Sequence, residues 1–145
     1  MMKKVGLGLL ALAFAAGTLF FIWKGNFAEH SLAGSWTIEV KNLNDEIVTT
    51  LLVEFTEEPA VSCIGLDFKA VQVLDYETID ATFFPVNDPI VYRLSDGEIS
   101  IGRANVCDNY FFLGGELKRG QATGGYLFTT IGESKQLGTF SMIRD

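Results

Sequence analysis

Hydrophobic and polar residues alternate along most of the chain after residue 33, with the period of two that is typical of half-buried β-strands. Trp36, Ile38 and Val40 alternate with polar neighbours in the first such segment. The same texture predicts strands at 47–55, 66–76, 81–86, 90–94, 98–103, 110–118, 122–130 and 137–143. Turn residues separate these segments, most clearly at Ser95-Asp96-Gly97 and Arg119-Gly120. The pattern predicts eight or nine short antiparallel strands in an all-β domain over residues 33–145.

Two architectures fit this number of strands: an up-and-down barrel and a two-sheet sandwich. An immunoglobulin-type sandwich has a core Trp between its two cysteines and a Tyr two residues before the second. No Trp lies between Cys63 and Cys107, and Asn105 occupies the second position. These departures favour a small antiparallel up-and-down barrel.

The N-terminal segment follows a different pattern. Lys3 and Lys4 precede an uncharged apolar run, Val5–Trp23, which ends at Lys24. A helix over this run would be about 28 Å long, enough to cross the hydrocarbon core of a bilayer. The basic start favours a cytoplasmic N-terminus, and Trp23 suits the opposite interface. We expect a single-pass signal anchor at 1–24, a linker at 25–32 and an extracytoplasmic barrel domain at 33–145, on the periplasmic or extracellular side.

A cleaved secretory signal is the alternative interpretation of this segment. Ala13-Phe14-Ala15 has the A-x-A form of a cleavage site. Cleavage there would leave an apolar tail, Leu19–Trp23, on the mature N-terminus, which favours the retained anchor. No Cys lies near the segment, which excludes a bacterial lipoprotein. Both interpretations place the folded domain outside the cytoplasm.

The two cysteines, Cys63 and Cys107, both lie in the predicted exported domain. An oxidising compartment favours their pairing, and a loop of this length would gain about 4 kcal/mol by the chain-entropy estimate. The chain has no C-x-x-C pair, and its one His, His30, lies in the linker. We therefore predict a structural disulfide rather than a reactive thiol.

Charge and composition exclude several classes of function. Residues 31–145 carry eight Lys and Arg against seventeen Asp and Glu, a net charge of −9, which argues against nucleic acid and anionic lipid as partners of the domain. The chain lacks a His base beside a nucleophile, a zinc cluster and a phosphate-binding loop. Asp75, Glu77 and Asp80 cluster without the spacing of a Ca²⁺ loop, so a solvated acidic rim is the favoured interpretation over a Ca²⁺ site. We expect no catalytic residue, metal or cofactor, and no enzymatic activity.

The two ends of the domain resemble the lipocalin and calycin barrels. Gly34-Ser35-Trp36 opens the first strand with a G-x-W motif, and Arg144 closes the last strand. In that family the Trp packs across the closed end of the barrel beneath a basic residue of the final strand. The resemblance implies a structural end-plug of Gly34, Trp36 and Arg144, in which the guanidinium lies over the indole face. It also implies a barrel that carries a small apolar ligand, although no biotin- or fatty-acid-contacting residues can be matched and the ligand-binding residues stay unknown.

Two pairs of adjacent aromatic residues, Phe83-Phe84 and Phe111-Phe112, lie in predicted strands. Adjacent strand residues point to opposite faces, so one of each pair faces outward unless both faces are covered. Exposed aromatic side chains of this kind mark partner surfaces. Together with the anchor, they favour a membrane-tethered interaction module, an accessory or assembly subunit that binds another membrane protein. The alternative is a lipocalin-like carrier of a small apolar ligand.

Overall fold

The computed structural model describes residues 31–145. The predicted anchor, Val5–Trp23, and the linker up to His30 lie outside the described residues. Between residues 31 and 145, no helix is long and apolar enough to span a membrane.

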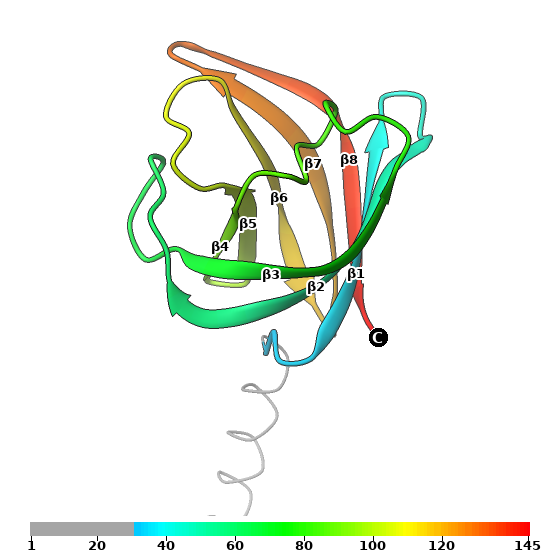
Figure 1. Cartoon of the computed structure of the whole chain (residues 1–145), viewed down its shortest axis with the longest axis vertical. Helices are drawn as coiled ribbons and strands as arrows, with labels where there is room; N and C mark the ends of the chain where they lie inside the picture. The colour runs from blue at the N-terminus through cyan, green and yellow to red at the C-terminus, as the bar shows by residue number, and fades with distance from the viewer. Residues whose placement is uncertain (1–30) are drawn as a thin grey trace, which may run out of the picture. The chain divides into compact units, whose positions relative to one another are not determined.

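Eight antiparallel strands form a closed barrel in which each strand pairs with its neighbours in sequence order (Figure 1). The strands are β1 (Ser35–Asn42), β2 (Ile47–Pro59), β3 (Lys69–Thr78), β4 (Ile90–Ser95), β5 (Glu98–Arg103), β6 (Tyr110–Lys118), β7 (Gln121–Thr130) and β8 (Glu133–Arg144). Pairing of β1 with β8, from Trp36 opposite Arg144 to Asn42 opposite Gly138, closes the barrel. The prediction of an all-β antiparallel barrel is confirmed for the described residues, and the sandwich alternative is excluded.

The predicted hairpins form where the sequence supplies residues that accept a positive φ. Asp96 and Gly97, at φ 53° and 82°, join β4 to β5. Arg119 and Gly120, at φ 51° and 77°, join β6 to β7 in the same way. Two consecutive positive φ angles are the requirement of the type I′ turn, whose twist matches that of the strands it connects.

The predicted strand at 81–86 does not exist, and the segment forms turns instead. The Asp80 carboxylate accepts hydrogen bonds from the N–H and the hydroxyl of Thr82, at 2.8 and 2.6 Å, which bends the backbone locally. Pro85 then removes a donor that a central strand would need. A second difference concerns the strand predicted at 47–55, because β2 continues to Pro59.

Inward-facing side chains from all eight strands fill the barrel with one hydrophobic core. The largest of its fully buried members are Trp36, Tyr126, Phe84, Ile38, Leu51, Ile99, Ile101 and Leu113. A smaller cluster of Phe68, Val91 and Ala104, with Ala60 against it, lies outside the main core. In this second cluster the loop 60–68, between β2 and β3, packs on the strand residue Val91.

Candidate interaction surface

One end of the barrel is closed by Trp36 and Arg144, the residues of the expected end-plug. Trp36 is fully buried, and the Arg144 guanidinium carbon lies 4.9 Å from the centre of its ring. The indole N–H donates a hydrogen bond of 3.1 Å to the carbonyl oxygen of Leu32, so this buried donor is satisfied. Gly34 has a φ of 93°, a backbone conformation that glycine adopts readily. A Cβ at this position would meet no neighbouring atom, so glycine is needed here for its backbone conformation and not for close packing.

Aromatic rings line the interior from the end-plug toward the other end. Phe55 contacts the Trp36 ring edge-on, with centroids 6.0 Å apart, and lies 4.9 Å from the ring of Tyr92. The Tyr92 hydroxyl donates a hydrogen bond of 2.8 Å to the carbonyl oxygen of Thr56, and burial raises its pKa. The polar atom of this interior ring is therefore satisfied by the protein's own backbone.

The segment between β3 and β4 covers the opposite end of the barrel and crosses back toward β4 in Figure 1. Its Phe83 and Phe84 rings both pack against Tyr126, at 5.1 and 5.7 Å between centroids. The Tyr126 hydroxyl donates a hydrogen bond to the carbonyl oxygen of Phe83, and burial raises the pKa of this phenol well above its ordinary value. An ion pair of 2.7 Å between Arg103 and Asp88 fastens the end of the segment to β5.

The four phenylalanines expected to form a partner surface have different environments. Phe84 is only 1% exposed and belongs to the core, so the structure corrects its assignment to an outer surface. Phe83 and Phe111 are half-buried and pack against the same core, where Phe111 also lies under the Arg103 guanidinium, 5.6 Å from its ring centre. Phe112 is half-buried beside Tyr110, with centroids 6.2 Å apart. The structure does not bring the four side chains together on one surface, and of them only Phe112 lies outside the core cluster.

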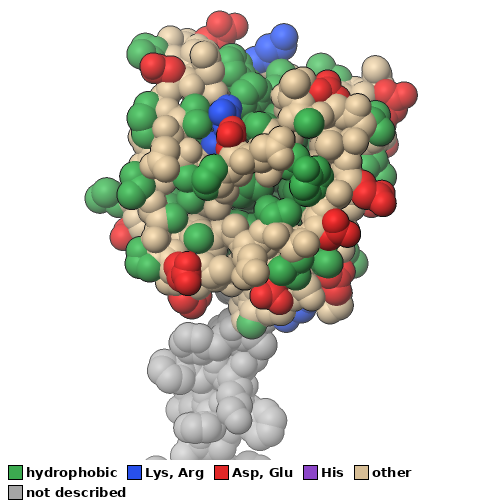
Figure 2. Space-filling view, in the orientation of Figure 1, with side chains coloured by type: hydrophobic (Ala, Val, Ile, Leu, Met, Phe, Trp, Pro, Cys, Tyr) green, Lys and Arg blue, Asp and Glu red, His purple; other side chains and the backbone are tan. Residues whose placement is uncertain are grey.

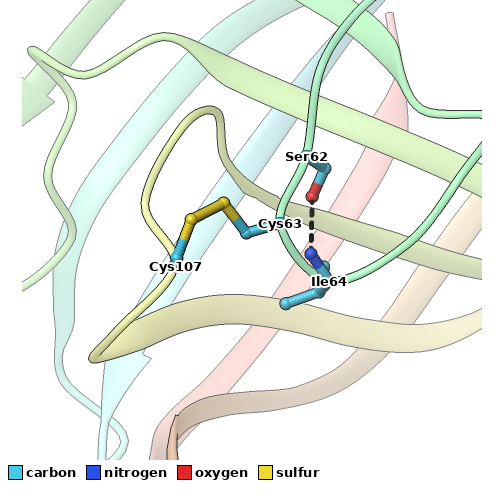
Figure 3. Close-up of a disulfide and its surroundings, with 4 residues drawn as sticks. All are labelled: Ser62, Cys63, Ile64 and Cys107. Atoms are coloured by element: carbon cyan, nitrogen blue, oxygen red, sulfur yellow. Dashed lines mark hydrogen bonds between the residues drawn. A yellow bond between two sulfur atoms is a disulfide. The ribbon is translucent and has the colours of Figure 1, made fainter.

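Cys63 and Cys107 form the predicted disulfide, which joins the β2–β3 loop to the loop between β5 and β6 (Figure 3). Their Cα atoms are 4.9 Å apart. Beside the bridge, the backbone N–H of Ile64 donates a hydrogen bond of 3.3 Å to the hydroxyl of Ser62, and an isolated bridge pairs Ser62 with Gly65. The crosslink therefore holds this compact turn against the loop between β5 and β6.

One contact attaches the β2–β3 loop to the barrel wall, and a second feature of the wall lies in β5 and β6. Phe68 is buried at the end of the loop, and the Arg93 guanidinium carbon of β4 lies 5.1 Å from the centre of its ring. Tyr110 of β6 is buried against Gly102 of β5, and a Cβ at position 102 would overlap the tyrosine ring. Burial also raises the pKa of the Tyr110 phenol. The glycine in β5 thus leaves room for a tyrosine on the outer wall, beneath the loop.

The same loop carries apolar side chains that nothing in the described chain covers. Val61, Ile64 and Leu66 are 71%, 43% and 82% exposed. We call these three residues, with the disulfide that holds them, the apolar loop. Because the loop is already fixed by a covalent bond and a buried aromatic, a partner would not have to order it on binding.

The acidic cluster of Asp75, Glu77 and Asp80 lies at the end of β3 and just after it. Within residues 31–145, no group of three or more His, Cys, Asp or Glu side chains is arranged to hold a metal ion. Asp75 and Asp80 instead accept hydrogen bonds from the backbone N–H groups of Tyr76 and Thr82, and the bonds from Thr82 lower the pKa of Asp80.

No family model, curated protein or solved structure matches the chain. The structure supports a small calycin-like barrel in its strand number, its antiparallel order and the contact between Trp36 and Arg144.

The apolar loop was not predicted from the sequence. Val61, Ile64 and Leu66 stand in a nine-residue stretch that was assigned partly to a strand, and the stretch has no regular period. The available signal was the combination of three large aliphatic residues with a cysteine that has to be near the surface to reach its partner loop.

Proposed function

We propose that this protein is a membrane-tethered extracytoplasmic interaction module, an accessory or assembly subunit of a membrane protein complex without enzymatic activity. One observation carries the proposal. The barrel interior is occupied by the chain's own side chains, while large aliphatic residues are exposed on an outer loop that a disulfide fixes in place. A partner that binds the outer surface would use the exposed aliphatic residues. A ligand that binds in the interior would have to displace the side chains that already fill it.

The energetic reason lies in the exposed aliphatic area. Full burial of a Leu, Ile or Val side chain is worth about 1.5–3 kcal/mol each. Leaving Val61 and Leu66 exposed forgoes most of that gain within this chain, and the partial exposure of Ile64 forgoes part of it. A rigid protrusion of this kind fits an apolar pocket on a folded partner, because its ordering cost has already been met by the disulfide and by Phe68.

The location belongs to the same proposal. A disulfide between Cys63 and Cys107 suits an oxidising compartment outside the cytoplasm. The apolar run Val5–Trp23 would supply the tether and would place the partner in or beside the same membrane. The net charge of −9 on residues 31–145 favours a protein partner over an anionic lipid surface.

A carrier of a small apolar ligand is the second candidate, and the contact of Trp36 with Arg144 at the closed end of the barrel favours it. A ligand would have to displace Phe84 from the core and open the contacts between the β3–β4 segment and Tyr126. Each of those steps costs free energy, whereas a carrier with an open lumen binds its ligand without displacing core side chains.

The test compares the native size of the full chain with that of surface variants after extraction from its own membrane in a gentle detergent. We expect the wild-type chain to migrate in a complex that contains a second membrane protein. Leu66→Ser should release the chain from that complex, while Ile131→Ser, at an exposed site in the β7–β8 turn, should leave it intact. Both variants should keep the wild-type melting temperature, because neither side chain is buried.

A wild-type chain that behaves as a monomer, in the membrane and in detergent alike, would contradict the proposal. A small molecule that co-purifies with this monomer would favour the carrier instead.

A further inference from the structure

Strand β3 pairs with β4 over a much shorter length than with β2. Only Lys69, Ala70 and Val71 lie opposite β4 residues, whereas pairing with β2 extends from Lys69 to Thr78. Beyond Val71, no strand in the part of the chain that the structure describes pairs with the outer edge of β3. We call residues 72–78 the free edge of β3.

Proline chemistry explains why the ladder stops at this point. The residue before Ile90, the last β4 residue to pair with β3, is Pro89, which has no N–H to donate. Its carbonyl oxygen accepts a hydrogen bond of 2.8 Å from the N–H of Ala104, on the other side of β4. The chain before Pro89 therefore turns away to cover the barrel end and leaves β3 without a neighbour.

The pairing register shows which backbone groups face the free side. The N–H of Ile79 donates a hydrogen bond of 3.0 Å to the carbonyl oxygen of Val48, on β2. Because backbone direction alternates along a strand, Tyr76 and Thr78 present their backbone groups away from β2. The N–H of Tyr76 is accordingly bonded to its neighbouring Asp75 carboxylate, at 2.9 Å, rather than to a strand.

Exposed apolar side chains and carboxylates flank this edge. Leu74 and Tyr76 are both 44% exposed, and Ile79, which follows the strand, is more exposed still. Ile79 also borders a groove of about 300 Å³ between the ends of β2 and β3. In Figure 2, hydrophobic side chains are visible in the middle of the face and at its edges, and most of the visible Asp and Glu side chains lie toward the margin.

The charge at the free edge is of one sign. Asp75 and Glu77 lie in it and Asp80 follows it, and none of the three forms an ion pair with a Lys or Arg of the described chain. An occupant that brings positive charge would compensate these carboxylates.

We propose that the free edge of β3 binds an extended segment of a partner protein by strand addition, and that this segment alternates Lys or Arg with apolar residues. The added strand would pair with the backbone groups of Tyr76 and Thr78. Its apolar side chains would cover Leu74 and Tyr76, and its basic side chains would meet Asp75 and Glu77. The proposal deepens the proposed function, because it names the chemistry of a partner for an interaction module.

A second copy of this chain fits the edge poorly. Antiparallel pairing of two such edges would bring the carboxylates of one copy next to those of the other, and like charges on facing strands destabilise the pair. The net charge of −9 on residues 31–145 adds repulsion over longer distances. The same charges attract a basic segment.

The test uses the full chain in detergent and a short fluorescent peptide that alternates lysine with valine. Binding is measured by fluorescence anisotropy at low salt. A second peptide of the same sequence carries N-methyl groups on the backbone nitrogens of one edge, which removes hydrogen-bond donors and keeps charge. We expect N-methylation to weaken binding by about tenfold or more, the factor that corresponds to the loss of one or two hydrogen bonds.

Four variants, one of them a control, locate the site. Tyr76→Pro removes the outward N–H without touching the ladder to β2 and should weaken binding about tenfold, while Tyr76→Thr keeps that N–H and should bind more tightly than the proline variant. The double variant Asp75→Asn, Glu77→Gln should weaken binding and flatten its salt dependence. Glu133→Gln, on β8, which does not pair with β3, is the matched control and should change neither the affinity nor its salt dependence.

Equal affinity for the two peptides would overturn the proposal and leave only charge attraction. Concentration-dependent dimerisation of the chain that Tyr76→Pro abolishes would assign the edge to a second copy instead. If Tyr76→Pro does not fold, the comparison of the two peptides and the double variant Asp75→Asn, Glu77→Gln still test strand addition at this edge. Failure here is distinct from failure of the proposed function, because Leu66→Ser tests the native complex and leaves the free edge untouched.

Discussion

The contact between Trp36 and Arg144 can be tested by its energetic coupling. Trp36 is fully buried, and its replacement by Ala should cost about 3–5 kcal/mol, since it removes a large apolar surface and opens a cavity. Arg144→Met keeps an aliphatic stem over the ring but removes the guanidinium. Loss of a shielded cation–π contact at 4.9 Å predicts a cost of about 1–2 kcal/mol.

The two substitutions should not be additive. Residues in direct contact show coupling energies of about 0.5–3 kcal/mol, and the pair is also directly opposed where β1 closes onto β8. In the double variant, Arg144→Met should therefore cost less than it does with Trp36 present. Trp36→Phe retains an aromatic ring but loses both the hydrogen bond to Leu32, worth about 1 kcal/mol, and the packing of the larger indole, so its cost should exceed that of the hydrogen bond and stay below that of Trp36→Ala.

Urea unfolding, followed by circular dichroism, measures these differences in free energy. Trp23 would obscure the fluorescence of the full chain, so emission is best recorded on a fragment that begins at Ser31 and keeps Leu32. We expect blue-shifted emission from Trp36 that is hard to quench. Red-shifted emission, together with small and additive effects of the two substitutions, would refute a buried Trp36 beneath Arg144.

Further predictions concern the crosslink, the close approach of two strands and the buried phenols. Cys63→Ser or Cys107→Ser should lower the free energy of unfolding by about 2–5 kcal/mol, and neither thiol of the native protein should react with an alkylating reagent before reduction. Gly124→Ala should destabilise by about 1–3 kcal/mol in thermal melts because the added Cβ would overlap backbone of β6, whereas at Gly125 it would meet only a Leu side chain, 3.5 Å away, and should be tolerated. Burial raises the pKa of Tyr126, so the folded state keeps this phenol protonated while the unfolded state loses the proton. Stability should then fall as pH rises above about 10, and less steeply in Tyr126→Phe, as urea titrations at several pH values would show.

The fold follows from the sequence where alternation and turn chemistry agree. The strand Glu98–Arg103 and the strand Tyr110–Lys118 have the predicted bounds, since each is bordered by residues that accept a positive φ or end a ladder. The segment 81–86 is the case in which composition and structure disagree. Its aromatic residues have the composition of a strand, but they fill the end of the barrel from a turn, and only the tertiary arrangement decides between the two.

The candidate surfaces were harder to predict, for a related reason. Alternation identifies side chains that face a core, and it carries no information on which apolar residues stay uncovered after the loops have packed. Phe84 illustrates this, because its neighbour Phe83 also packs against Tyr126, so both members of the pair are used by the chain itself. Leu66 illustrates the opposite case, an aliphatic residue that sequence patterning assigned to a strand and that the loop leaves exposed.

The occupied interior and the free edge of β3 have a common origin in the segment between β3 and β4. To bring Phe84 into the core, this segment has to leave the wall of the barrel, and Pro89 lets it rejoin the wall only at β4. The same path that fills the barrel end thus removes the strand that would otherwise pair with residues 72–78. A ligand that displaced Phe84 would have to move this segment, and the added strand proposed here would lie beside it. Binding in the interior and binding at the free edge would therefore be coupled, and an edge partner that fixed the segment in place would oppose a ligand in the barrel.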